Sequence, residues 1–474
     1  MRVDDAWYSG DRRRLAKVYS HHAPASERRR RVWGRKPTHR ADRRDYRLHV
    51  PLPGDIAATS AALLFADMPK IRVADDNKAA QDRLESLLDA GSVHQTLLGA
   101  AEQAAALSGI FLRVTWDRDV IDRPLLSAMQ PDQAVPEFRY GMLRAVTFWR
   151  ELSGSTESVV WRHLERHEPG RILHALYMGT RDNLGRAIPL AEHPDTIDLA
   201  PTVDKDGATP TLIRGLTAAY VPNMTPNRMH RTSPVGRSDY AAPIYDMFDS
   251  LDATWTSWMR DLRLARARLI VPDGYLRNNG PGEGADFDEE RELWQRLKIP
   301  PNEQGGNALT LAQFAIRVEE HRATAESITR QAAQAAGYSP QSFGLETDGA
   351  AVTATEVDSR DERSDVTRKA KAGHWRHGLG DILYALLQVD AVQFGSGVKA
   401  ERPRVEFGGA TESEQQRATT LDLLARAGAV STATKVKYLH PEWDDTAVKA
   451  EVAAILAETG AGAPDPGGSY PLAA

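Results

Sequence analysis

Two histidines and two glutamates in one short segment are the first residues whose types and spacing could do chemistry. His163 and His167 stand four residues apart, with Glu165 and Glu168 beside them, and imidazole and carboxylate groups are common zinc ligands. The surrounding residues read as a β-strand, in which residues four apart also share a face. No third ligand is suggested, so a polar sheet face is the favoured interpretation and a metal site is the minor alternative.

A second candidate group is His374, Arg376 and His377, which surround Trp375 and could contact phosphate. The segment has a helical pattern, and a helix normally carries such residues on its surface or against a neighbouring chain. Ordinary surface or inter-subunit packing is therefore the favoured interpretation. Phosphate contact remains the alternative.

Established catalytic motifs are absent from the sequence. It contains no G-x-x-x-x-G-K-[ST] phosphate loop, no G-x-S-x-G nucleophile elbow and no H-E-x-x-H zinc motif. It also contains no cysteine, which excludes disulfides, thiolate metal clusters and a cysteine nucleophile. We therefore expect no enzymatic activity and no cofactor.

Charge divides the chain into two parts. Residues 1–47 hold 15 Lys and Arg against 6 Asp and Glu, whereas the remainder holds 45 against 59. A basic arm before an acidic body is typical of contact with a polyanion or with an acidic neighbouring subunit. A solvated leader is the equal alternative, although the arm carries interleaved aromatics at Trp7, Tyr8, Tyr19 and Trp33. No apolar run is long enough to predict a membrane span, and the start lacks the apolar core of a signal peptide.

The first half of the chain predicts helices followed by strands. A turn-rich link over 49–55 leads into a helix over 56–65, and a second helix is expected over 82–107. Residues 108–222 contain β-branched and aromatic runs separated by Gly, Pro and Asp. We therefore expect a strand-rich module there.

A regular apolar stripe predicts a long helix after residue 240. Its members alternate four and three residues apart: Ile244, Phe248, Leu251, Trp255, Trp258, Leu262, Ala265 and Leu269. A helix of about 30 residues, or roughly 45 Å, would end at Pro272 and Gly274. Such a stripe needs a partner along its whole length.

The remaining elements follow from breaks and caps. Residues 273–307 form a Gly/Pro-rich, acidic excursion with a short helix at 287–297, and a helix over 318–336 then ends at Gly337. After a loop over 338–352, a capping box at Thr353 and Glu356 starts a helix to about Gln388, which glycines could interrupt. A strand is expected at 403–407, helix starts at Thr411, Ser431 and the paired acids Asp444 and Asp445, and a flexible tail at 460–474.

Four segments of the sequence stand out in a fixed order. They are His49-Val-Pro-Leu-Pro-Gly-Asp-Ile-Ala-Ala-Thr-Ser-Ala-Ala-Leu-Leu-Phe65; Gly236-Arg-Ser-Asp-Tyr240, which runs into the tryptophan-bearing helix and Ala267-Arg-Leu-Ile-Val-Pro272; Gly337-Tyr-Ser-Pro-Gln-Ser-Phe-Gly344; and Thr353-Ala-Thr-Glu-Val357. In this order and with matching spacing, they resemble portal proteins of long-tailed double-stranded DNA phages, and the likeness covers about residues 45–457.

The resemblance implies a portal, or head-to-tail connector: a dodecameric ring at one capsid vertex through which DNA is packaged and later ejected. The implied partners are further copies of the chain, the double-stranded DNA in the channel, the terminase large subunit, the head-to-tail adaptor, and the major capsid and scaffolding proteins, with no membrane. The implied location is the virion, and the host cytoplasm during assembly. A nucleic-acid-processing enzyme and another virion structural protein are the alternatives.

The fold class implied is α+β, as a portal-type fold assembled as a ring. Its expected parts are a basic arm (1–47), a strand-rich wing (48–239), a helical stem (240–270 and 318–337), a small α/β clip (271–317), a tunnel loop (338–352), a wing-spanning helix and strand (353–410), a helical crown (411–457) and a tail (458–474).

The resemblance also assigns candidate roles to residues. The oligomer interface would include Phe248, Leu251, Trp255, Trp258 and Leu262. Charges facing the channel would include Glu319, Glu320, Arg322, Glu326 and Arg330, and the tunnel loop would present Ser339, Gln341, Ser342, Glu346, Thr347 and Asp348 to DNA. The clip would dock partners through Asp286, Asp288, Glu289, Glu290 and Trp294. An acidic body suits a channel that must pass DNA without gripping its phosphates.

Overall fold

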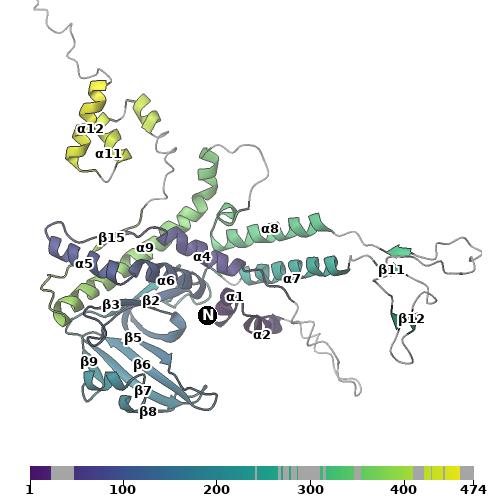
Figure 1. The fold of residues 1–474 in the computed structure, drawn as a ribbon, viewed down its shortest axis with the longest axis horizontal. Coiled ribbons are helices and arrows are strands. Elements are labelled where there is room, and N and C mark those ends of the chain that lie inside the picture. Colours follow the sequence, from purple (N-terminus) through teal and green to yellow (C-terminus); the bar gives the residue numbers. More distant parts are fainter. Residues whose placement is uncertain are drawn as a thin grey trace, which may run out of the picture. The chain divides into compact units, whose positions relative to one another are not determined.

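A computed structural model describes most of the chain. It covers residues 1–22, 47–240, 243–264, 268–270, 277–278, 285–286, 310–312, 317–345, 354–408, 421–428, 430–440 and 443–458. Two compact units are present: the first contains residues 1–350 and 360–407, and the second contains 351–359 and 408–474. Helices and strands are both abundant (Figure 1), which confirms the α+β class.

The N-terminal residues begin the core of the first unit instead of forming a solvated leader. Helices α1 (Arg2–Ser9) and α2 (Arg12–His22) open the chain. The Trp7 side chain is only 1% exposed, and its ring lies 5.5 Å from that of Phe248. Tyr8 donates a hydrogen bond of 2.8 Å to Glu102. Of the two alternatives for the arm, a solvated leader is therefore wrong for the segment around Trp7 and Tyr8, because these aromatic side chains pack into a core. Residues 23–46 lie outside the described part.

Four helices build the centre of the first unit. They are α4 (Leu52–Phe65), α5 (Lys78–Ala90), α6 (Val93–Leu107) and the 40-residue α9 (Ala354–Gln393). The predicted single helix over 82–107 is divided, because Ser92 adopts a positive φ of 49° between α5 and α6. The glycines of α9 do not interrupt it. Gly378 instead allows β10 to approach, since a Cβ there would lie 2.5 Å from Val221.

The strand-rich module predicted over 108–222 is confirmed as two antiparallel sheets. The smaller sheet has the order β10-β2-β3, formed by Ala218–Pro222, Gly109–Thr115 and Leu125–Met129. The larger has the order β4-β5-β6-β7-β8, with β9 also paired to β7; the strands are Ala134–Arg139, Met142–Glu151, Val160–Glu168, Arg171–Gly179, Arg186–Ile188 and Ala208–Pro210. The predicted strand near 403–407 is β15 (Arg404–Glu406), which pairs with β1 (Lys70–Arg72).

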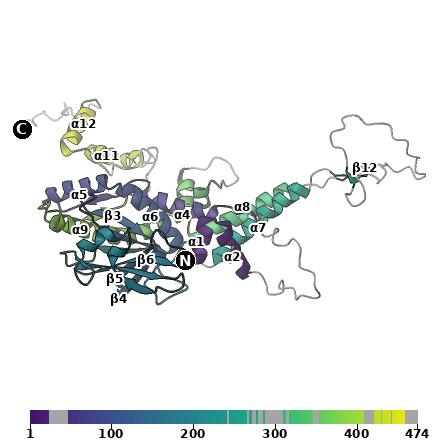
Figure 2. The same cartoon turned by 60° about the horizontal axis from the view of Figure 1, so that its bottom comes forward.

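Helices α7 (Pro243–Leu264) and α8 (Val318–Ala336) lie side by side in both cartoon views (Figures 1 and 2). They are antiparallel, because Asp261 near the end of α7 accepts hydrogen bonds of 3.0 Å from Arg317 and His321 at the start of α8. Gly337 caps α8 with a φ of 98°, as predicted. The apolar face of α7 thus finds part of its partner within the same chain.

The expected length of the helix after residue 240 is wrong at its C-terminal end. Residues Arg268–Ile270 form strand β11, which pairs antiparallel with β14 (Thr310–Ala312). Pairing with a complementary strand competes with helix continuation, which the apolar spacing alone did not reveal. A second pair joins β12 (Arg277–Asn278) to β13 (Ala285–Asp286). The predicted helix at 287–297 lies outside the described residues.

The second unit contains helices α11 (Thr432–Leu439) and α12 (Asp445–Glu458). Ser431 caps α11 by accepting a hydrogen bond of 3.3 Å from the Thr434 amide, and Asp444 accepts one of 2.8 Å from the Ala447 amide. Both predicted helix starts are confirmed, whereas the start at Thr411 and the tail lie outside the described residues. No helix in the described part of the chain is both long and apolar enough to cross a membrane.

Candidate functional site

A buried ion pair marks the place where α7 and α8 join the rest of the first unit. The Lys371 ammonium lies 2.6 Å from the Asp239 carboxylate, and both side chains are 1% exposed. The Tyr338 hydroxyl donates a hydrogen bond of 2.8 Å to the same oxygen, Oδ2. The other oxygen, Oδ1, accepts one of 2.8 Å from Asn223, while Lys371 also donates to Ser60 at 2.7 Å. We call these five residues the Asp239 junction.

The Asp239 junction draws on five parts of the fold. Ser60 comes from α4, Lys371 from α9 and Asn223 from the end of β10. Asp239 lies four residues before α7, and Tyr338 lies two residues after α8. The junction therefore connects both ends of the segment 240–337 to the rest of the first unit.

Burial sets the charge states in the Asp239 junction. Removal from water lowers the pKa of Lys371, and the negative charge of Asp239 acts in the opposite direction. Burial and then the charge of Asp239 raise the pKa of Tyr338 well above its ordinary value, so its hydroxyl remains a donor. The Asp239 junction was not identified from the sequence. Ser60, Asp239 and Tyr338 fall within three of the quoted segments, but nothing in the sequence indicates that Lys371 faces them.

The predicted oligomer interface divides into buried and accessible residues. Phe248 and Leu251 are 1% and 2% exposed within a single chain, where they pack with α1 and α4, so their assignment to a subunit interface is wrong. Trp255 and Trp258 are half-buried, with ring centroids 5.1 Å apart, and Trp258 stacks on His321 at 5.9 Å. Leu262 is 39% exposed and remains accessible to a neighbouring molecule.

The charged residues proposed for the channel lie along α8. Glu319, Glu320, Arg322 and Glu326 are exposed, and Arg330 is half-buried. Arg322 donates a hydrogen bond of 2.8 Å to Glu319 and lies 3.9 Å from Glu326. These contacts link neighbouring turns of one helix. Their orientation toward a channel remains a prediction.

The start of the predicted tunnel loop is ordered against α9. The Ser339 amide donates a hydrogen bond of 2.8 Å to Ser364, and the Ser342 and Ser364 hydroxyls lie 3.1 Å apart. Ser339 is 2% exposed, so its prediction as a DNA-contacting residue is wrong, because α8 and α9 bury it. Gln341 and Ser342 are half-buried in the 3₁₀ turn Pro340–Phe343.

Other predicted site residues lie beyond what the structure describes. Glu346, Thr347 and Asp348 of the predicted tunnel loop are among them, as are Asp288, Glu289, Glu290 and Trp294 of the predicted clip. Asp286 belongs to β13, of which only the backbone is described. Their roles stay predictions.

The histidines of the larger sheet form a buried polar network on β6 and β7. His163 lies 3.2 Å from His174 in a parallel stack, and burial lowers its pKa to about 4. His167 lies 2.7 Å from Glu165 and 2.6 Å from Thr217, and Arg113 also pairs with Glu165. Within the described ranges, no group of three or more metal-ligating side chains is arranged to hold a metal ion. The favoured interpretation as a polar sheet face agrees with this network.

The histidines of α9 border a groove. His374 lies 3.3 Å from Thr225, and exposed His377 lies 3.3 Å from Asp381, which also accepts a hydrogen bond of 2.8 Å from Arg402. The groove has a volume of about 1240 Å³ and lies between α9, the hairpin of β4 and β5, and residues 212–222. These contacts agree with the favoured interpretation of surface packing.

Comparison with known proteins gives neighbours among solved structures, while no family model and no curated protein matches the chain. Three of these neighbours are chains of gene transfer agent (GTA) particles. One, from the virion of the native GTA particle, is 14% identical, with 90% of this chain and 98% of that chain covered and a TM-score of 0.39.

Two further neighbours come from GTA necks. One, from the neck of the empty particle computed with C6 symmetry, is 16% identical, covers 88% and 97% of the two chains and has a TM-score of 0.39. The other, from the neck of the native particle computed with C12 symmetry, is 14% identical, covers 90% and 98% and has a TM-score of 0.41. Nearly the whole of this chain is thus aligned with each neighbour.

Proposed function

We propose that this chain is the subunit of a viral portal. Twelve copies would form a closed ring at one capsid vertex, with a channel through which double-stranded DNA is packaged and ejected. The ring would dock the terminase large subunit and later the head-to-tail adaptor, and would contact the major capsid and scaffolding proteins. It would act in the virion, after assembly in the host cytoplasm, as a conduit and not as an enzyme.

The antiparallel pair of α7 and α8, held at its base by the Asp239 junction, is the observation that carries this proposal. The pair leaves the body of the unit and leads, at its other end, to the ribbon of β11 and β14 (Figure 1). The segments with portal resemblance in the sequence include both sides of its base, 236–240 and 337–344. A stem and a clip occupy these places in the family that the sequence resembles.

The surfaces of the paired helices favour assembly. Leu262 and Val318 expose 39% and 40% of their surface near the end of the pair that is far from the Asp239 junction, and the two tryptophans of α7 are only half-buried. Two helices cannot cover each other on all sides, so further apolar surface needs neighbouring copies. A closed ring supplies such neighbours on both sides of every subunit.

The exposed charges on α8 suit a channel. Glu319, Glu320 and Glu326 outnumber Arg322 on the exposed part of this helix. In a ring of twelve, each such residue becomes a ring of like charge, and a net negative lining repels DNA phosphates. A lining that does not attract the phosphates allows DNA to slide, whereas many cation–phosphate contacts would hold it in place.

Native mass spectrometry of the purified full chain tests the proposal. We expect a discrete assembly of about twelve copies at micromolar concentration and near-physiological salt. The variant Leu262→Asp should weaken that assembly, since its charge would be placed in a subunit interface, whereas Asp422→Lys, an exposed change in the second unit, serves as a control. A wild-type chain that stays monomeric under these conditions would contradict the proposal.

A further inference from the structure

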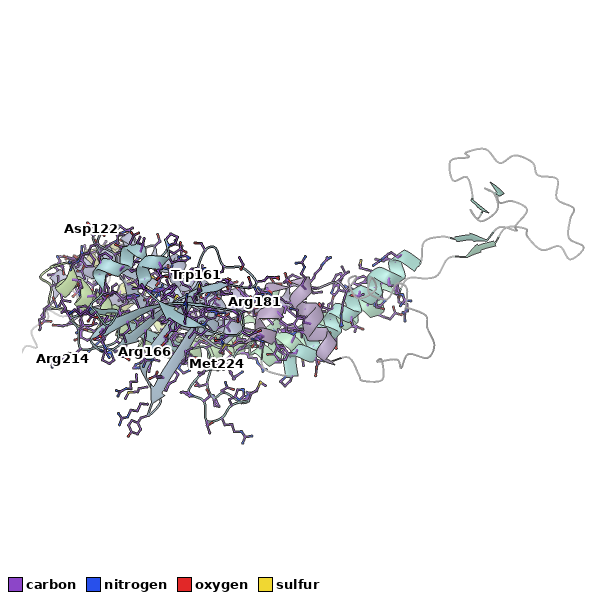
Figure 3. The ribbon with its side chains drawn as sticks, turned by 90° about the horizontal axis from the view of Figure 1, so that it is seen from below. Asp122, Trp161, Arg166, Arg181, Arg214 and Met224 are labelled. Carbon is purple, nitrogen blue, oxygen red and sulfur yellow. The ribbon has the colours of Figure 1, made fainter. Side chains whose placement is uncertain are left out.

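Two faces of the first unit carry opposite charge. In Figure 3, Asp122 lies on one side of the unit, and Arg214 and Met224 lie on the other. Asp122 and Arg214 are exposed and each belongs to a larger group of exposed side chains of the same charge, which we call the acidic turn and the basic groove. A chain with complementary surfaces on opposite sides can bind copies of itself head to tail.

The basic groove is the 1240 Å³ groove described above, together with the loop over residues 223–237. Arg144 and Arg214 line it, and Arg228 and Arg231 are exposed on the loop, which contains no acidic residue. Among the described residues, Arg214, Arg228 and Arg231 form no ion pair. The only carboxylate in the lining, Asp381, is already paired with Arg402.

The loop that carries Arg228 and Arg231 is held in a defined shape. Asn227 accepts hydrogen bonds of 3.1 and 3.0 Å from the amides of Met229 and His230, and donates one of 2.9 Å to the Gly236 carbonyl. The Gly236 amide in turn donates to the Tyr220 hydroxyl at 3.0 Å. The cationic side chains are therefore presented from a fixed backbone, which lowers the entropy cost of binding.

Apolar side chains are also exposed at the basic groove. Met142 is 70% exposed and Leu212 is 65% exposed, and both line it. Leu212 has a φ of 60°, in the left-handed region that a leucine seldom adopts. Such an outlier is a reason to look for function, because the strain persists only where the surroundings impose it. A partner for this groove needs both negative charge and an apolar contact.

The acidic turn, residues 117–122, has this chemistry. Asp117, Asp119 and Asp122 are exposed around Val120, which is itself 79% exposed. Three further exposed acids lie on the neighbouring helix α5: Asp82, Glu85 and Asp89. An apolar tip between carboxylates matches an apolar groove between arginines.

The arginines near the acidic turn form contacts with other groups of the same unit, and they therefore leave the carboxylates of the turn without a strong partner. Arg83 pairs with the buried Asp390 at 2.7 Å, Arg118 bonds to Gln393, and Arg123 donates a hydrogen bond of 3.0 Å to the Ala90 carbonyl. Asp122 lies 3.8 Å from Arg123 but is 95% exposed, so this contact is weak. The acids of the turn thus remain available to a partner.

We propose that the acidic turn of one copy docks into the basic groove of the next, with Val120 contacting Leu212 and Met142. The inference rests on the proposed function, because a ring requires a head-to-tail contact, and it names the partner as a second copy of this chain. The contact is heterologous: each copy donates one turn and receives another.

Charge exchange between variants tests this contact in the full chain. Arg214→Glu with Arg228→Glu, and separately Asp119→Lys with Asp122→Lys, should each shift the ring peak in native mass spectrometry toward monomers by about tenfold or more. An equimolar mixture of the two variants should restore rings of alternating composition, because each altered face then meets an altered face of opposite charge. Arg181→Glu with Arg186→Glu is the matched control for exposed charge reversal and should assemble like the wild type.

Cross-linking gives an independent result that does not depend on charge. The chain has no native cysteine, so the double variant Val120→Cys with Leu212→Cys should form a ladder of covalent oligomers under mild oxidation. Thr202→Cys with Leu212→Cys, which moves one thiol to another exposed site, should not. Wild-type rings with no such ladder, together with normal assembly of both charge variants, would refute the docking contact and leave the portal proposal standing. Absence of wild-type rings would instead contradict the portal proposal itself.

Discussion

Lys371→Met is the substitution that examines the Asp239 junction most sharply. Methionine keeps an unbranched apolar chain of similar length but removes the ammonium, so the Asp239 carboxylate stays buried with only Tyr338 and Asn223 as donors. Removing one partner of a buried ion pair costs about 3–5 kcal/mol, because the other charge is left without compensation. We expect this cost to fall on the attachment of α7 and α8, since both ends of that pair meet at the junction.

Hydrogen exchange measures this cost locally. The chain contains two compact units, so a single free energy of unfolding is not well defined for it. Amides near the base of the pair, in residues 244–251 and 332–338, should exchange faster by roughly two to four orders of magnitude in the variant, because 1.4 kcal/mol is a tenfold change. Amides of β5 and β6 should be little affected.

Lys369→Met is the matched control two residues earlier on α9. Lys369 is 67% exposed and pairs with Asp365 at 2.5 Å, and such surface pairs contribute about 0–1 kcal/mol. Its exchange should therefore resemble that of the wild type. In the double variant Lys371→Met with Asp239→Asn, hydrogen exchange should slow partway back toward the wild-type rate, because the unpaired carboxylate is then removed. Equal exchange in Lys371→Met and Lys369→Met would refute the reasoning.

Three further predictions concern the remaining features. Burial lowers the pKa of His163 in the folded chain to about 4 from 6.5, so the unfolded chain binds a proton at higher pH than the folded chain does. The free energy of unfolding should therefore fall as the pH drops from about 6.5 to 4. Urea unfolding should show a smaller fall for His163→Asn. Phe248→Ala should destabilise the first unit by about 3–5 kcal/mol, seen as a lower urea midpoint in the monomer and not only in the ring. Trp7→Ala should lower that urea midpoint by a similar amount. An unchanged midpoint would indicate that residues 1–9 are a solvated leader.

Local sequence signals predicted most of the fold because they act over a few residues. The cap at Gly337 and the helix start at Ser431 follow from backbone conformation and side-chain hydrogen bonds within one turn. The stripe of α7 correctly predicted a helix. It did not reveal that α1 and α4 cover Phe248 and Leu251, because those neighbours are distant in sequence.

Local sequence signals could not predict the Asp239 junction or the two docking faces, because these depend on residues that are distant in the sequence. Lys371 meets Asp239 from 132 residues away, and a lone lysine in a helical pattern is normally read as exposed. Likewise, Val120 and Leu212 belong to short apolar pairs, Val120-Ile121 and Leu212-Ile213, and only the structure shows that Val120 and Leu212 are the exposed members. Contacts between distant elements depend on the tertiary arrangement, which periodicity does not contain.

Electron microscopy of the purified full chain tests the central claim most directly. We predict end-on class averages with twelvefold symmetry and an open central channel, and side views in which the paired helices α7 and α8 surround that channel. Averages that show separate monomers, or a closed assembly without a channel, would contradict the account of this chain as a portal subunit.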